Sequence, residues 1–354
     1  MKSYGNLYQR LCSYKNLEKA FRKARKGKSS KWYVKEFEKD LAGNLTLLKK
    51  ELETMAYQPR PLKKFVIRDP KTRVIRKSSF RDRIIHHALV NVIEPIYERI
   101  FIFDSYANRM GKGTSAALKR FDIFKRKANR DGKGGKGIGY VFKADIKQFF
   151  DSVHHDTLIK IFEKKIRDKK VLWLITIIIK NFDSEEKGMP LGNMTSQFFA
   201  NVYLNGLDYF VKHVLRMKCY LRYVDDFVII HKQKEILEKC RHDITEYLKS
   251  IQLELHPQKS KIFLLYKGVE FLGFKTFYHY RLLRNRNIKR FKKRISKLKE
   301  QYDMNIVSQT QIYNSIQGWM AYAKGGNTFK LRKNLMKEVK NIFDKQLCIK
   351  GISK

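Results

Sequence analysis

The sequence predicts an α+β fold in which helical segments flank a central sheet. Three observations predict it: helical periodicity in the N-terminal part, short apolar strand-like runs in the middle, and helical periodicity again near the C-terminus. The segments therefore follow the order helices, sheet with its helices, then helices. A chain of 354 residues with 43% hydrophobic residues can bury two or three packed units and is not disordered throughout.

The N-terminal part predicts a long helix, a hairpin and a second helix. Apolar residues recur at three- or four-residue steps over 31–56, as in an amphipathic helix. The sequence YQPRP at 57–61 ends this helix, because proline cannot continue the backbone hydrogen-bond ladder. Residues 64–77 are typical of a hairpin with an Asp-Pro turn, and a helix is expected over about 81–100.

The rest of the chain predicts the sheet and a helical end. A strand is expected over 140–150, a helix over 193–215, and a strand, an acidic turn and a second strand over 219–230. Residues 268–283 are expected to form a hairpin-like pair. Beyond residue 285 the chain is expected to be helical, and its first helix has an apolar stripe with basic residues over the rest of its surface.

The charge balance is the strongest compositional signal. Lys and Arg number 77 against 34 Asp and Glu, a formal net charge of +43. This excess indicates a polyanionic partner, first of all nucleic acid, whereas an anionic membrane is the second candidate. The longest apolar run, at 171–179, is too short to cross a bilayer, so no membrane partner is expected. The four cysteines form no C-x-x-C pair, which favours a cytoplasmic protein.

Three carboxylates are candidates for a metal site. Asp145 ends one expected strand, and Asp225 with Asp226 forms the turn between two others. If these strands are neighbours in one sheet, the three carboxylates meet at one end of it. Hard cations such as Mg²⁺ bind carboxylates together with substrate phosphates, and two ions about 4 Å apart assist an in-line phosphoryl displacement. The alternative interpretation is that the adjacent aspartates are simply a polar turn.

The order of several motifs resembles that of reverse transcriptases. YVDD at 223–226 is similar to their motif C, and FKADIKQFFDSV at 142–153 is similar to motif A. GMPLGNMTSQFFANVYLNGLD at 188–208 is similar to motif B, and LHPQKSKIFLLYKGVEFLGF at 255–274 to motifs D and E. The resemblance implies an RNA-directed DNA polymerase with a right-hand fold, in which helices flank an antiparallel palm sheet. It implies fingers and the start of the palm at 1–140, the palm at 141–279 with a fingers segment at about 152–187, and a helical thumb at 280–354.

The resemblance also implies roles for individual residues. Two Mg²⁺ ions, with Mn²⁺ as a substitute, would be held by the catalytic Asp145, Asp225 and Asp226 and by the Ile146 carbonyl. Phe150 stands where the family has an aromatic side chain that collides with a ribose 2′-hydroxyl, although a core aromatic is the alternative. The other implied nucleotide contacts are Lys71 or Arg68, Arg73, Leu191, Gly192, Gln197 and Lys259. The implied nucleic-acid contacts on the basic helix are Lys289, Arg290, Lys293, Arg294 and Lys297.

Lys259 and the start of motif B carry more specific implications. Lys259 matches a lysine that gives a proton to the leaving pyrophosphate, with a solvated surface charge as the alternative. Leu191-Gly192 and Ser196-Gln197 stand where most relatives have Gln-Gly and Ser-Pro, a pattern similar to that of diversity-generating retroelement reverse transcriptases. That class misincorporates opposite template adenines. Because leucine cannot form the hydrogen bond that glutamine offers near the nucleotide, looser discrimination is expected.

The same resemblance implies the partners of the chain. They are a template RNA, a primer with its cDNA, dNTPs and a small basic accessory protein. Two other interpretations remain: a reverse transcriptase of bacterial antiviral defence, and a non-catalytic RNA-binding scaffold. Neighbouring genes would separate the first from a retroelement enzyme, and the three filled acidic positions argue against the second.

Overall fold

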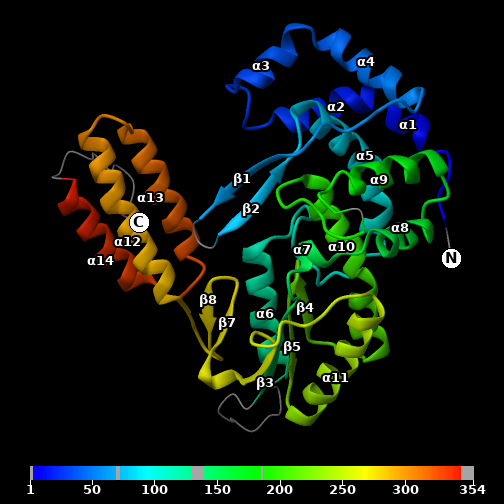
Figure 1. The fold of residues 1–354 in the computed structure, drawn as a ribbon. Helices are drawn as coiled ribbons and strands as arrows, with labels where there is room; N and C mark the ends of the chain where they lie inside the picture. The colour runs from blue at the N-terminus through cyan, green and yellow to red at the C-terminus, as the bar shows by residue number, and fades with distance from the viewer. Residues whose placement is uncertain (1–2, 69–71, 129–138, 185, 344–354) are drawn as a thin grey trace. The chain divides into compact units, whose positions relative to one another are not determined.

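The computed structural model describes residues 3–68, 72–128, 139–184 and 186–343. The chain, traced in Figure 1, divides into two compact units, each made of segments that are distant in the sequence. The first unit comprises Met1–Gly113, Ala144–Val228 and Glu238–Lys261. The second comprises Thr114–Lys143, Ile229–Leu237 and Ile262–Lys354.

The N-terminal part of the first unit is helical, but the helix expected over 31–56 is divided in two. Asp40 breaks it, because its side chain accepts a hydrogen bond from the Gly43 amide at 2.9 Å and caps a new helix instead of continuing the old one. The helix expected over 81–100 is confirmed. The five helices are α1 (Tyr8–Cys12), α2 (Tyr14–Arg25), α3 (Trp32–Lys39), α4 (Leu41–Glu53) and α5 (Phe80–Glu98).

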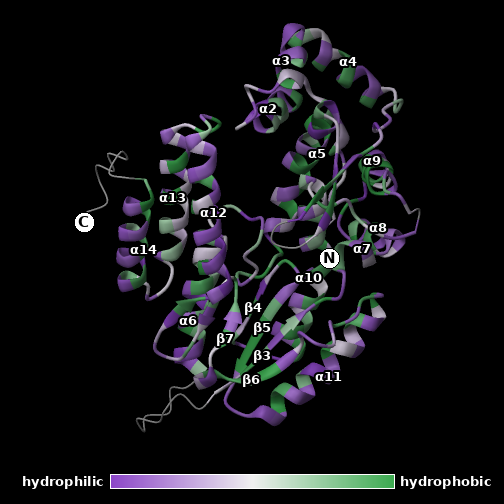
Figure 2. Ribbon diagram, turned by 60° about the vertical axis from the view of Figure 1, so that its left-hand side comes forward, coloured by the Kyte–Doolittle hydropathy of each residue, from purple (hydrophilic) through white to green (hydrophobic). Residues whose placement is uncertain are grey.

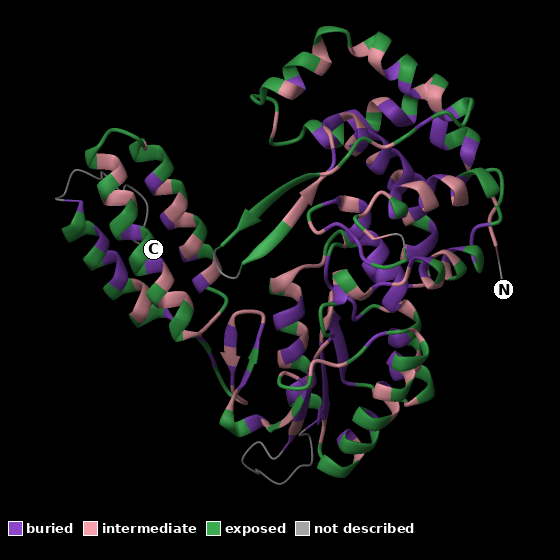
Figure 3. Cartoon of the chain, in the orientation of Figure 1, coloured by how far each residue is buried: buried purple, intermediate pink, exposed green. Residues whose placement is uncertain are grey.

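The hairpin expected over 64–77 is confirmed by strands β1 (Lys63–Ile67) and β2 (Arg73–Lys77). They pair antiparallel, with Phe65 opposite Ile75. The expected Asp-Pro turn lies outside the described residues. All of β1 is exposed, as Figure 3 shows, so this strand is not part of the hydrophobic core of the first unit.

A four-stranded sheet contains the two strand-and-carboxylate segments that the sequence predicts, but the strand expected over 140–150 ends at Asp145 and a helix begins at Phe149. Its strand order is β4-β5-β3-β6, which makes β3 a neighbour of β5 although they are far apart in the chain. The interior of β5 is a continuous buried apolar run, typical of a strand covered on both faces, and these strands are largely hydrophobic in Figure 2. The strands are β3 (Tyr140–Asp145), β4 (Tyr220–Tyr223), β5 (Asp226–His231) and β6 (Lys261–Leu264).

The helix expected over 193–215 is confirmed, although its hydrogen bonding changes near the end. Its α-helical part, α10 (Met194–Tyr209), continues as a short π-helix at Phe210–Val214. The Tyr203 hydroxyl donates a hydrogen bond to the Ile251 carbonyl at 2.7 Å, just beyond the end of α11. The other helices between the strands are α6 (Thr114–Ala128), α7 (Phe149–Ser152), α8 (His155–Glu163), α9 (Lys169–Lys180) and α11 (Lys234–Ser250).

The C-terminal part of the second unit is a small sheet followed by helices. The pair expected over 268–283 is instead three antiparallel strands, because the short turn after Phe271 is followed by a second reversal after Thr276. The helices confirm the expectation beyond residue 285, and a shared core that includes Phe291 and Ile295 joins them. The elements are β7 (Val269–Phe271), β8 (Phe274–Thr276), β9 (Arg281–Leu283), α12 (Asn285–Asp303), α13 (Gln309–Ala323) and α14 (Phe329–Ile342).

Candidate active site

The candidate site lies in the first unit, where the end of β3 meets the turn between β4 and β5. Asp145 is the last residue of β3, and Asp225 lies in the turn just before β5. The Ile146 amide donates a hydrogen bond to the Asp225 carbonyl at 3.3 Å. The structure therefore brings Asp145 and Asp225 together. Asp226 is the half-buried first residue of β5.

The segment before β6 holds Asp145 from another direction. The His256 amide donates a hydrogen bond to the Asp145 carbonyl at 2.7 Å, and the Lys147 amide donates to the Glu254 carbonyl at 2.9 Å. This pairing brings Lys259 close, so that its Nζ lies 2.8 Å from Asp145 Oδ1. The Lys259 side chain is 39% exposed, so the pair adds little stability and its main effect is on the charge of the site.

The pKa of the Asp225 carboxyl is raised above its ordinary value. Burial is the main cause and the neighbouring Asp145 carboxylate adds to it, whereas the cations of Lys259 and Arg73 oppose it. Asp145 and Asp225 are therefore close enough to repel each other. Arg73 begins β2, so the exposed hairpin also contributes a positive charge to this site.

The donor chemistry of this pair fits Mg²⁺. The carboxylates of Asp145 and Asp225 repel each other, and burial raises the pKa of Asp225. A cation that prefers hard oxygen ligands would stabilise both. Within the described residues, no three or more His, Cys, Asp and Glu side chains gather into a metal-binding group. That observation is compatible with Mg²⁺, which usually takes only one or two carboxylates and completes its coordination with water and substrate phosphates.

The start of motif B is fixed against the hairpin. The Arg76 amide of β2 donates a hydrogen bond to the Leu191 carbonyl at 3.1 Å. Gly192 has a φ of 117°, and a Cβ there would lie 2.8 Å from Ile75 Cγ2, so a larger residue would push the hairpin away. The half-buried Leu191 is thus held beside the strand that begins with Arg73, whereas Lys71 lies outside the described residues.

Two other predicted nucleotide contacts lie at the starts of helices. Phe150 belongs to α7, is half-buried, and packs edge-to-face on the Phe149 ring with centroids 5.4 Å apart. Its carbonyl accepts a hydrogen bond from the Met189 amide at 2.7 Å, which joins motif A to motif B. Gln197 is exposed in the first turn of α10. The structure therefore joins the backbones of motifs A and B.

The predicted nucleic-acid contacts lie on α12. Its buried face includes Phe291 and Ile295, as the apolar stripe in the sequence predicts. The basic side chains occupy the remaining surface of the helix, where Arg290 is half-buried and the other four are exposed: Lys289, Lys293, Arg294 and Lys297.

A buried ion pair beside the turn that contains Asp225 was missed by the sequence reasoning. Arg222 of β4 and Asp208 of α10 are both fully buried and pair at 2.6 Å. A signal for them exists in the sequence, because each is a single charge inside an apolar run, in YLRYV and NGLDYF. Since an unpaired buried charge is very costly, two such charges predict each other as partners.

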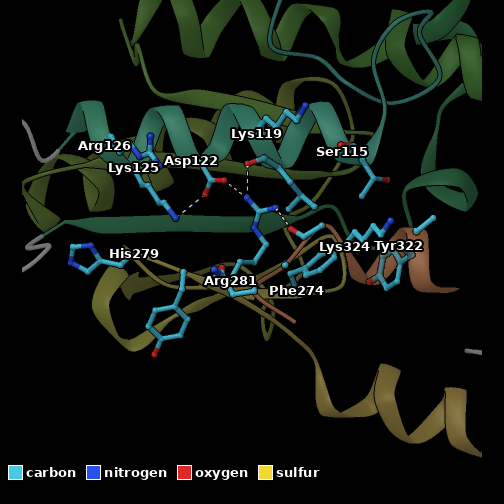
Figure 4. Close-up of a pocket in the computed structure, with 17 residues that line it drawn as sticks. Ser115, Lys119, Asp122, Lys125, Arg126, Phe274, His279, Arg281, Tyr322 and Lys324 are labelled. Carbon is cyan, nitrogen blue, oxygen red and sulfur yellow. Dashed lines mark hydrogen bonds and ion pairs between the residues drawn. The ribbon is translucent and has the colours of Figure 1, made fainter. Parts of the chain in front are cut away.

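A cavity of about 670 Å³ lies within the second unit, and none of its lining residues is a predicted site residue (Figure 4). Arg281 of β9 crosses it, donating hydrogen bonds to the Leu118 carbonyl of α6 at 3.1 Å and to the Gly325 carbonyl at 2.8 Å. Arg281 also pairs with Asp122, and Lys125 lies 2.7 Å from the same carboxylate. These contacts join α6, β9 and the loop after α13, so the cluster has a structural role.

Replacing Arg281 with methionine is expected to lower the free energy of unfolding by about 2 kcal/mol. The change leaves the carbonyls of Leu118 and Gly325 without this donor and leaves Asp122 with less compensation for its charge. Urea unfolding followed by circular dichroism measures the effect. Lys119→Ala is the matched control, because Lys119 lines the same cavity but is exposed, and a change within about 0.5 kcal/mol is expected. Equal stabilities for the two variants would contradict the structural role of Arg281.

The helices of the described segments include none with the length and apolar content of a membrane span.

Comparisons with known proteins assign the family. Residues 63–276 match the family described as "Reverse transcriptase (RNA-dependent DNA polymerase)". Protein YkfC of Escherichia coli (strain K12) is 28% identical over 289 residues, which are 70% of this chain and 73% of that protein. The group II intron-encoded protein LtrA of Lactococcus lactis subsp. cremoris is 28% identical over 226 residues, 61% of this chain and 35% of LtrA. The Retron Ec48 reverse transcriptase of Escherichia coli is 25% identical over 177 residues, 48% of this chain and 41% of that enzyme.

The family match covers more than half of the chain and includes every motif quoted from 142 to 274. It implies a palm-type polymerase fold, an RNA template and nucleotide substrates. The prediction of an RNA-directed DNA polymerase is thereby confirmed at the level of the family. The chain belongs to the reverse transcriptase family and is an RNA-directed DNA polymerase.

Proposed function

We propose that this chain makes cDNA at the site formed by Asp145 and Asp225, and that it is error-prone at template adenines, as in diversity-generating retroelements. The pairing of β3 with β5 supports the site, because it brings the two carboxylates together, and burial with the repulsion of Asp145 raises the pKa of Asp225. Asp145, Asp225, Asp226 and the Ile146 carbonyl would hold two Mg²⁺ ions. When bound, these ions supply activation of the attacking hydroxyl and charge stabilisation at the leaving oxygen.

The residues of the chain divide the remaining work. Arg73, with Lys71, would bind the triphosphate of the incoming dNTP, and the electrostatic effect of Arg73 on Asp225 supports this role. Phe150 would exclude a ribose 2′-hydroxyl, and Gln197 would contact the nucleotide from the first turn of α10. The basic face of α12 would follow the backbone of the template–primer duplex, as a thumb does in a fingers–palm–thumb polymerase.

The error-prone class is proposed from the identity and placement of Leu191. Its carbonyl is fixed by the Arg76 amide, and Gly192 packs on Ile75, so position 191 lies beside the hairpin that begins with Arg73. A glutamine there would offer a hydrogen bond near the nascent base pair, whereas leucine offers only contact area. Discrimination against mispairs at this position is therefore reduced. A small basic accessory protein is part of the same proposal.

Replacing Leu191 with glutamine is expected to lower the misincorporation rate opposite template adenines about fivefold. One added net hydrogen bond contributes about 1 kcal/mol, which corresponds to this factor. Sequencing of primer-extension products on an RNA template with all four bases measures the rates. Leu191→Met is the control, because it preserves apolar volume and adds no donor, and it should resemble wild type. Wild-type errors spread evenly over the four bases would refute the proposed class.

The polymerase proposal itself is tested by extension of a DNA primer on an RNA template. Wild type is expected to incorporate dNTPs with Mg²⁺, to stop when the metal is chelated, and to use rNTPs poorly. A chain that binds the template without extending the primer in Mg²⁺ or Mn²⁺ would instead be a scaffold. Addition of a basic accessory protein from the same gene cluster tests the proposed partner, which is expected to raise product yield.

A further inference from the structure

The turn that contains Asp225 has strained backbone geometry. Val224, which precedes Asp225, has a φ of 57°, in the left-handed region. A β-branched side chain crowds the backbone at this φ, so valine rarely adopts it. Strained residues persist only where the surrounding structure imposes the conformation, and they cluster at functional sites. Some neighbouring group must therefore hold Val224 in this conformation.

Arg222 reaches this backbone from β4. Its side chain is fully buried, and its Nη1 donates a hydrogen bond to the Val224 carbonyl at 2.9 Å. The same guanidinium binds Asp208 of α10 in a bidentate manner, with Nε 2.7 Å from Oδ1 and Nη2 2.6 Å from Oδ2. Bidentate pairing fixes the orientation as well as the position of the guanidinium. The turn is thus connected through Arg222 to the helix of motif B.

Additional contacts hold this pair in one geometry. Arg222 donates to Asn201 Oδ1 at 3.1 Å and to Ser105 Oγ at 3.3 Å, and the Tyr220 hydroxyl donates to Asp208 Oδ1 at 2.7 Å. Burial opposes the charge on Arg222, but the attraction of Asp208 outweighs it and raises the pKa of the guanidinium. The guanidinium therefore keeps its charge at neutral pH, although it is completely removed from water.

Stability alone does not explain such a pair, because hydrophobic residues of similar volume often serve a core equally well. The contact with Val224 supplies an explanation. We propose that Arg222, held by Asp208, is a positioning residue that keeps the turn at Val224 in the conformation that directs Asp225 to the site shared with Asp145. This inference rests on the proposed polymerase site and adds a residue that acts through Asp225 without contacting substrate.

The test compares Arg222→Lys with the double variant Arg222→Lys/Val224→Gly in primer extension. Lysine keeps the charge but cannot bind Asp208 bidentately and reach Val224 at once. We expect kcat to fall about 30-fold with the KM for dNTP changed less than about threefold, because a misplaced catalytic group slows the chemical step. Adding Val224→Gly should return kcat to within about threefold of wild type, because glycine adopts this φ without crowding.

Arg81→Lys is the matched control, because Arg81 of the first unit is also an ion-paired arginine, with Glu51 as its partner. It should leave kcat within about threefold of wild type at a temperature where all variants are folded. If Arg222→Lys does not fold, Asp208→Asn replaces it, since asparagine preserves shape and removes only the charge. An unchanged kcat, or a loss that Val224→Gly does not reverse, would overturn the inference.

Wild type and Asp225→Asn are included in the same assay to separate two kinds of failure. An inactive wild type would mean that the proposed polymerase site is wrong. An active wild type, an inactive Asp225→Asn variant and a normal Arg222→Lys variant would leave the polymerase site standing and remove only the positioning role of Arg222.

Discussion

Replacing Asp225 with asparagine is expected to abolish dNTP incorporation while making the folded chain more stable. Asparagine lacks the negative charge with which Asp225 would bind Mg²⁺ and support the transition state of nucleotide transfer. The rate of dNTP incorporation should therefore fall by at least about 10³-fold. Burial and the repulsion of Asp145 make the ionised Asp225 unfavourable in the folded chain, and asparagine removes this cost. Activity and stability should therefore change in opposite directions.

The stabilisation should depend on pH with a definite sign. Because the folded pKa of Asp225 lies above its ordinary value of 3.8, the group favours folding below about that pH, where it is protonated. This contribution is lost as the pH rises through the raised folded pKa and the carboxyl ionises. Asparagine cannot ionise, so its advantage in melting temperature over wild type should grow from pH 4 towards pH 7, measured by thermal melts in metal-free buffer.

Asp151→Asn is the control for this experiment. Asp151 is an exposed carboxylate in α7, the helix that follows β3. Its substitution by asparagine removes the same charge without changing the carboxylate pair of Asp145 and Asp225. Its stability should stay within about 0.5 kcal/mol of wild type. Loss of stability in Asp225→Asn at pH 7, or incorporation within tenfold of wild type, would contradict the interpretation of Asp225.

Local sequence patterns were sufficient to predict the strands next to the candidate metal-binding carboxylates. YVFKAD and the two apolar runs around the aspartate pair specify strands by residue type alone. The first strand ends at Asp145, and Asp225 lies in the turn between the other two. The hairpin at Arg73 and the buried stripe of α12 were predictable for the same reason. What the chain alone leaves open is which strand lies beside which, and the neighbouring positions of β3 and β5 answer that question.

Other parts depend on interactions that no local pattern contains. Asp40 ends one helix through a side-chain hydrogen bond to Gly43, which competes with a periodicity that would otherwise continue. The contact between Lys259 and Asp145 depends on backbone pairing between distant segments, in which the His256 amide binds the Asp145 carbonyl. With so many lysines in the chain, the residue type gave no reason to single out Lys259 apart from the motif resemblance.

Replacing Lys259 with alanine is expected to slow nucleotide incorporation about 10²-fold. The ammonium lies 2.8 Å from Asp145, where its charge offsets that of the carboxylate pair. We propose that it also gives a proton to the leaving pyrophosphate. Loss of a general acid should appear in kcat, with a smaller change in the KM for dNTP. Single-turnover primer extension on an RNA template measures the rate of the chemical step.

Lys259→Arg separates the two roles of this side chain. Arginine keeps a full positive charge beside Asp145 but does not release a proton under ordinary conditions. If proton donation dominates, the arginine variant should be nearly as slow as the alanine variant, and the solvent deuterium isotope effect of wild type should be reduced in both. Lys261→Ala is the matched control, because Lys261 is an exposed lysine two residues away. A wild-type rate for Lys259→Arg would mean that charge alone matters, and a wild-type rate for Lys259→Ala would remove Lys259 from the mechanism.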